Sequence, residues 1–132
     1  MRRRVTDARV ARVGTLDEHG RAHIVPIVFV IDGDTLYSAT DAGPRPVKRL
    51  RNLERDHRVT VLVDVYDEDW SKVWWVRIRG RGRAVGDGPE RDRARSLLFQ
   101  KYPQFEDAPP TEAAGPVMAV DVEEWSGWAF SE

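Results

Sequence analysis

The residues best suited to chemistry lie in the segment 37–55, where a strand, a proline-broken turn and a helix follow one another. Backbone N–H groups at a helix start attract anions, and cationic side chains in the first turns complete a phosphate cradle. The side chains that this pattern singles out are Ser38, Thr40, Lys48, Arg49, Arg51 and Asn52. A basic helix face in solvent has the same spacing, so phosphate binding and simple solvation both remain open.

A second candidate is a row of arginines in the segment 72–86, the longest predicted strand. Trp75, Arg77, Arg79, Arg81 and Arg83 alternate there with small or apolar residues, which places them on one face. Such a face can bind single-stranded nucleic acid, pair with the acidic C-terminal segment, or reach the tail of a cofactor. The formal net charge of −1 disfavours nucleic acid as a partner.

The histidines, the lack of cysteine and the lack of two common motifs exclude most other kinds of catalytic or metal site. The chain has three histidines, and a turn separates His19 from His23, so these two do not share a helical face as a zinc pair needs. Cysteine is absent, which removes thiolate catalysis, disulfides and iron–sulfur clusters. The sequence also lacks a Walker loop and a Gly-x-Ser-x-Gly elbow. We therefore predict no metal site and no nucleophilic hydrolysis.

Length and composition set the frame for these sites. The 132 residues suffice for one domain, 1–132, and 41% hydrophobic with 33% charged residues is a globular balance. No apolar stretch is long enough to cross a bilayer, and no apolar run follows the basic start as a secretory signal requires. We expect a cytoplasmic protein that has no membrane partner.

Six strands and two helices are predicted to position the candidate residues. The strands are expected over 10–16, 23–31, 35–40, 59–65, 72–86 and 116–122, and the helices over 46–55 and 89–102, with the stretch 103–115 least structured. The second strand is apolar on both faces, so it needs a barrel interior on one side and a second layer or subunit on the other. This order favours a mainly β (α+β) fold, a small β-barrel with peripheral helices.

Several local sequences resemble the pyridoxamine 5'-phosphate oxidase (PPOX)-like split β-barrel superfamily. The resemblance covers nearly the whole chain and is carried by the segments 8–16, 20–29 and 48–59. Two further segments, Tyr-Asp-Glu-Asp-Trp at 66–70 and Trp-Trp-Val-Arg at 74–77, resemble a specific branch. That branch comprises actinobacterial oxidoreductases that depend on the deazaflavin coenzyme F420 (FDOR-B type).

The resemblance implies a six-stranded, FMN-binding-like split barrel that forms a homodimer, with the cofactor at the subunit interface. By the family pattern Lys48 and Arg49 hold the cofactor phosphate. The supporting residues implied are Asn52 on the same helix face, Ser38 and Thr40 as hydroxyl contacts, Val25, Pro26 and Ile27 behind the ring, and Trp75 and Arg77 toward the cofactor tail or the substrate.

The same resemblance implies that the cofactor carries the chemistry, so the chain needs no catalytic acid or base of its own. The first hypothesis is hydride transfer from reduced F420 to a small unsaturated organic acceptor. The second is an FMN-dependent oxidase or reductase on the same fold. The third is a non-enzymatic flavin- or deazaflavin-binding protein.

Overall fold

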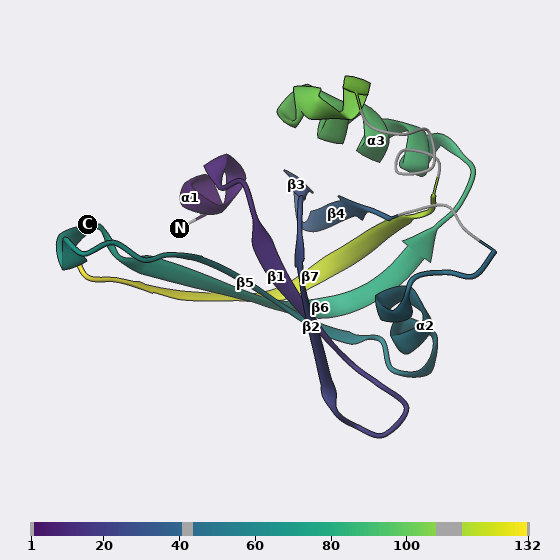
Figure 1. Cartoon of the computed structure of the whole chain (residues 1–132), viewed down its shortest axis with the longest axis horizontal. Coiled ribbons are helices and arrows are strands. Elements are labelled where there is room, and N and C mark those ends of the chain that lie inside the picture. The colour runs from purple at the N-terminus through teal and green to yellow at the C-terminus, as the bar shows by residue number, and fades with distance from the viewer. Residues whose placement is uncertain (1, 41–43, 108–114, 132) are drawn as a thin grey trace.

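The computed structural model describes residues 2–40, 44–107 and 115–131, and these form one curled antiparallel sheet with helices around it (Figure 1). The strand order is β2-β1-β5-β6-β7-β4-β3. The strands are β1 (Ala11–Leu16), β2 (Ala22–Ile27), β3 (Val30–Asp32), β4 (Thr35–Ala39), β5 (Arg58–Val65), β6 (Trp74–Val85) and β7 (Val117–Ala129). The helices are α1 (Arg2–Asp7), α2 (Lys48–Arg55) and α3 (Pro89–Lys101), with short 3-10 turns η1 (Trp70–Lys72) and η2 (Pro103–Asp107).

The sheet curls because its two end strands, β2 and β3, are consecutive in the chain and only Val28 and Phe29 separate them. Its inner face is apolar: Val13, Val61 and Ile78 are fully buried there. Burying such β-branched side chains stabilises the fold by about 1.5–3 kcal/mol each. Helix α2 packs against β1 and β6, and α3 packs against β3, β4 and β7.

The prediction of six strands is wrong, because the expected strand 23–31 is divided into β2 and β3. Phe29 turns into the core and is fully buried. Its N–H donates to the hydroxyl oxygen of Tyr102 at 3.2 Å, and its carbonyl oxygen lies 3.1 Å from the same hydroxyl. The Tyr102 hydroxyl, at the end of α3, therefore satisfies both backbone groups of Phe29, which elsewhere in the sheet would bond to a neighbouring strand. The regular strand ends at this position.

Three other segments differ from expectation. Strand β7 runs to Ala129 instead of ending near 122, because it continues to pair with β6 as far as Trp74. The start of the expected loop 103–115 is the turn η2, whose Phe105 ring lies 5.1 Å from that of Phe99. Helix α2 begins at Lys48 rather than Pro46. Residues 41–43 of the predicted turn and 108–114 of the predicted loop lie outside the described residues.

Beyond the body of the barrel, β5, β6 and β7 extend together as a long arm that ends near the C-terminus (Figure 1). Aromatic side chains stay exposed on this arm: Trp70 is 61% and Trp128 is 48% exposed. Among the helices described, none is long and apolar enough to cross a membrane.

An ionic cluster ties α3 to β6 and β7. The guanidinium of Arg83 donates to Glu90 at 2.7 and 2.8 Å and to Asp121 at 2.8 and 3.1 Å, and the Tyr37 hydroxyl donates to Glu90 at 2.8 Å. Arg83, followed by Tyr37, lowers the pKa of Glu90 from its ordinary 4.5 to about 2. Arg83 also lowers the pKa of Asp121. The pairing between the arginine face and the acidic C-terminal segment, one of the predicted alternatives, is thus confirmed at Arg83.

This cluster predicts a specific acid sensitivity. A carboxyl whose folded pKa is depressed stabilises the fold above its ordinary pKa, and that stabilisation is lost as pH falls toward the folded value. We expect the unfolding free energy of the wild type to fall more steeply between pH 4.5 and 2 than that of Glu90→Gln. Urea unfolding across this range measures it, with Glu68→Gln in the exposed 67–69 loop as the control. Parallel curves for wild type and Glu90→Gln would contradict the assignment.

Candidate functional site

The predicted phosphate cations stand at the start of α2, beside the end of β4 and the β1–β2 turn. The guanidinium of Arg49 donates to the carbonyl oxygen of Ala39 at 3.3 Å. The ammonium of Lys48 lies 3.4 Å from the carboxylate of Glu18, and both side chains are about half exposed. Among the described residues, no side chain caps this helix start at Val47. Because exposed ion pairs contribute little to stability, an incoming anion can compete with Glu18 for Lys48.

Asn52, Ser38 and Thr40 are buried behind these cations. The Asn52 amide is fully buried; it donates to the Thr15 hydroxyl at 3.0 Å and its oxygen accepts from Arg55 at 3.0 Å. The Ser38 hydroxyl donates to the Val28 carbonyl at 2.7 Å, and the Thr40 hydroxyl donates to that of Pro116. Each of these three groups makes at least one hydrogen bond within the protein, and these bonds hold α2 and β4 in place.

The three residues predicted behind the cofactor ring divide between the two faces of β2. Ile27 is buried in the core and Val25 packs against it, whereas Pro26 is exposed on the opposite side. The division follows from the two-residue period of a strand. The Pro26 ring and the backbone of β2 are therefore the parts of this segment that a bound molecule can touch.

The outer face of the sheet is a regular grid of side chains. One register row across five strands reads Pro26, Arg12, Leu62, Arg77 and Ser126. The next row is Ile24, Gly14, Thr60, Arg79 and Glu124. A hollow of about 620 Å³ lies over β2, β1 and β5, where glycine at position 14 leaves the face open.

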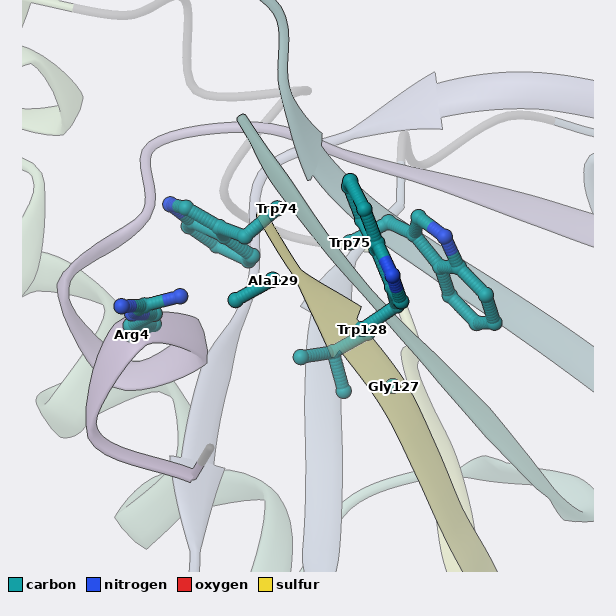
Figure 2. Close-up of a pocket in the computed structure, with 7 residues that line it drawn as sticks. Arg4, Trp74, Trp75, Gly127, Trp128 and Ala129 are labelled. Carbon is teal, nitrogen blue, oxygen red and sulfur yellow. The ribbon is translucent and has the colours of Figure 1, made fainter. Parts of the chain in front are cut away.

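Trp75 and Arg77 project from the same outer face, on β6. The guanidinium carbon of Arg77 is 5.4 Å from the centroid of the Trp75 ring, which is a cation–π contact. Trp128 lies opposite Trp75 on β7, and Figure 2 shows these two indoles together on one side of the strands while Trp74 and Arg4 lie on the other. The predicted site residues thus form two groups: the cations at α2 with their buried support, and the outer-face group Pro26, Trp75 and Arg77.

Some buried polar atoms have no hydrogen-bond partner in the described part of the chain. They draw attention to two residues that were not predicted as part of the site. These atoms include Nδ1 of His23, on β2 opposite Thr15, and Oγ of Ser126, next to Arg77 in the register. Nε of Arg77 is a further such atom. The sequence pointed to neither His23 nor Ser126, because only the strand register places them beside predicted site residues.

The residues present fit an anionic, planar cofactor. Buried polar atoms are nearly always hydrogen-bonded in native proteins, so three partnerless atoms around the two groups suit a polar ligand. Two cations at an uncapped helix start suit a phosphate. Within residues 2–40, 44–107 and 115–131, no cluster of three or more histidine or acidic side chains is arranged to hold a metal ion.

The antiparallel sheet curls into a barrel that stays open between its end strands β2 and β3, and α2 packs against it. This arrangement is that of a split β-barrel. The chain belongs to the pyridoxamine 5'-phosphate oxidase family, whose family model matches residues 1–129. A search of curated proteins gave no match.

Solved structures with the same fold come from several bacteria. The conserved hypothetical protein Rv2991 from Mycobacterium tuberculosis is 16% identical, with a TM-score of 0.78 over 95% of this chain and 79% of that one. A FAD-binding protein from Mesorhizobium loti is 23% identical, with a TM-score of 0.72 over 93% and 87%. HutZ, the heme storage protein of Vibrio cholerae, is 12% identical, with a TM-score of 0.72 over 97% and 92%. At these identities the likeness concerns the fold alone.

Proposed function

We propose that this chain is an oxidoreductase that binds coenzyme F420 and passes a hydride to a small unsaturated organic acceptor. The observation that carries the proposal is the pair Lys48 and Arg49 at the uncapped start of α2. Family membership supports a flavin-type cofactor. The choice of F420 rests on the resemblance of segments 66–70 and 74–77 to the F420-dependent branch.

In this proposal each group of residues has a separate task. Lys48 and Arg49 bind the cofactor phosphate, and Asn52 keeps their helix against β1 through its bond to Thr15. Ser38 and Thr40 fix the end of β4 beside them. The exposed Pro26 and the backbone of β2 flank the ring, while Trp75 and Arg77 face the side from which the acceptor approaches.

A second copy of the chain completes the site. The outer face of β2, β1 and β5 is uncovered in one copy and carries exposed apolar side chains between polar ones: Ile24 is 64% and Leu62 is 36% exposed. Such a face in a sheet protein is typical of a surface that another subunit covers. A two-fold dimer through this face is self-complementary and brings the outer-face group of one copy toward the α2 cations of the other.

The chain's own contribution to the reaction is binding, orientation and exclusion of water. When bound, reduced F420 supplies the hydride, and water supplies the proton that completes reduction of the acceptor. The partner copy that covers the outer face would keep solvent away from the transfer. No side chain has to act as an acid or base for this division of labour.

FMN is the second candidate cofactor, and the FAD-binding protein from Mesorhizobium loti, which shares the fold, favours it. The same α2 cations would bind the FMN phosphate. The two candidates differ in what reoxidises the reduced cofactor: FMN can react directly with oxygen, whereas the F420 proposal requires an organic acceptor.

The experiment that tests the function is an anaerobic reoxidation assay with reduced F420 and a panel of unsaturated organic acceptors. We expect acceptor-dependent return of the oxidised deazaflavin absorbance with the wild-type protein, and at least tenfold slower return with Lys48→Ala/Arg49→Ala at the same cofactor concentration. Protein-dependent reoxidation of reduced FMN by an acceptor under the same anaerobic conditions, with none of F420, would assign the protein to the FMN alternative. If neither cofactor turns over although one of them binds, the protein is a non-enzymatic cofactor-binding protein.

A further inference from the structure

The arm carries a hollow that the phosphate-binding residues do not use. It has a volume of about 370 Å³ and lies over β5 and β6, with Leu62, Asp64, Tyr66, Trp74, Trp75 and Arg77 in its lining. Two register pairs form its floor on the outer face, Leu62 opposite Arg77 and Asp64 opposite Trp75. The lining is mostly apolar and aromatic, which is the usual character of a small-molecule site of this size.

The aromatic part of the hollow is suited to a flat ligand. Trp75 stands beside the indole of Trp128, and the latter is 48% exposed (Figure 2). Tyr66 is 66% exposed at the rim. Indole faces bind planar rings by offset stacking, and an exposed indole gains from being covered. The volume of the hollow is large enough to admit a ligand of two fused rings.

The charged part of the hollow is suited to an anion. Asp64 is paired with Arg12 at 3.3 Å, so its charge is compensated within the sheet. Arg77 has no carboxylate partner among the described residues, and its Nε is buried without a hydrogen-bond partner there. The parallel N–H groups of a guanidinium match the two oxygens of a carboxylate.

We propose that this hollow is the subsite for the hydride acceptor, and that the acceptor is a planar aromatic compound with one carboxylate. The ring lies against Trp75 and the carboxylate binds the guanidinium of Arg77, both of which line the hollow. The role as acceptor subsite rests on the proposed function, whereas binding of the planar carboxylate does not. This assignment puts Trp75 and Arg77 on the substrate side of the site rather than at the cofactor tail.

The test measures binding to the protein without any cofactor. The probe is 2-naphthoate, and 2-naphthamide is its uncharged isostere; both are titrated by ligand-detected NMR. We expect naphthoate to bind more tightly than naphthamide. Arg77→Gln should weaken naphthoate binding by about tenfold or more and abolish the preference for the charged probe. Trp75→Leu should weaken both probes alike.

Two controls separate this subsite from a general basic surface and from the cofactor site. Arg79→Gln removes a charge from the same face of the same strand, one register row farther from Trp75, and should change naphthoate binding less than twofold. Lys48→Ala/Arg49→Ala should weaken naphthoate binding much less than Arg77→Gln does, although cofactor binding is lost. Equal effects of Arg77→Gln and Arg79→Gln, or no preference for naphthoate in the wild type, would overturn the proposal. Failure of cofactor binding with naphthoate selectivity intact would instead overturn the proposed function alone.

Discussion

Replacing Lys48 and Arg49 together with alanine is expected to weaken cofactor binding by about 100-fold or more. A charge-assisted hydrogen bond to a phosphate contributes about 1.5–3 kcal/mol, and the proposal gives each cation at least one such bond. The fold should tolerate the change, because Lys48 is partly exposed and its present partner is the exposed Glu18. Fluorescence titration with F420 and with FMN measures the loss of affinity.

The matched control removes the same charge from elsewhere. Arg51 follows on α2 and bonds the Pro46 carbonyl at 2.7 Å, and Arg95 lies on α3 over Phe99. Arg51→Ala/Arg95→Ala should therefore change the cofactor dissociation constant less than about threefold. If this control weakens cofactor binding as much as Lys48→Ala/Arg49→Ala does, the loss of affinity comes from the lower net charge of the protein and not from a phosphate site.

The largest expected effect on stability is at Gly80. A Cβ atom there would overlap the carbonyl oxygen of Asp121 and lie only 3.2 Å from the Cα of Val122. Both atoms belong to the backbone of β7, which cannot move without breaking the ladder with β6. We expect Gly80→Ala to lower the unfolding free energy by about 3 kcal/mol, a large part of the total stability of a domain of this size.

Alanine substitutions at two other glycines serve as controls for Gly80→Ala, and urea unfolding measures the stability of all three variants. A Cβ at Gly82 would lie 2.6 Å from a methyl group of Leu53, which can rotate away, so Gly82→Ala should cost about 1 kcal/mol. A Cβ at Gly86 would meet nothing within 4 Å, so Gly86→Ala should be close to neutral. Equal costs at the three positions would show that β7 does not approach β6 as closely as described.

The substitution at Gly80 is also expected to affect the proposed acceptor subsite on β6. The β6–β7 register shifts between Arg79 and Gly80, where a β-bulge leaves Glu123 unpaired between Val122 and Glu124. This shift decides that Ser126 lies opposite Arg77 and Trp128 opposite Trp75. A change that disturbs the bulge should therefore weaken naphthoate binding as well as stability.

Local patterns in the sequence predicted the elements well. The alternation along 72–86 gave the right faces of β6, and helix α3 lies where the sequence predicted it, at Pro89–Lys101. The second strand was expected to be apolar on both faces, and the exposed Ile24 shows that one of its faces is uncovered in a single copy.

What local patterns missed depends on contacts between distant residues. The strand break at Phe29 is made by Tyr102, 73 residues farther along the chain. Asn52 fits a phosphate-binding helix face by its spacing, yet its amide is used by Thr15 from another element. Arg77 lies opposite Ser126 because of the β-bulge between Arg79 and Gly80, and no local sequence pattern predicts this bulge. Positions on one element were predictable, whereas side-chain partners between elements were not.

A parallel titration of the purified protein with F420 and with FMN determines whether the chain binds a deazaflavin or a flavin at α2. Quenching of tryptophan fluorescence and the fluorescence of each cofactor are followed together. We predict micromolar binding of F420, clearly tighter than that of FMN, and loss of this binding in Lys48→Ala/Arg49→Ala. Tight binding of FMN alone would contradict the choice of F420. Binding of neither cofactor would contradict the assignment of a flavin-type cofactor site to this chain.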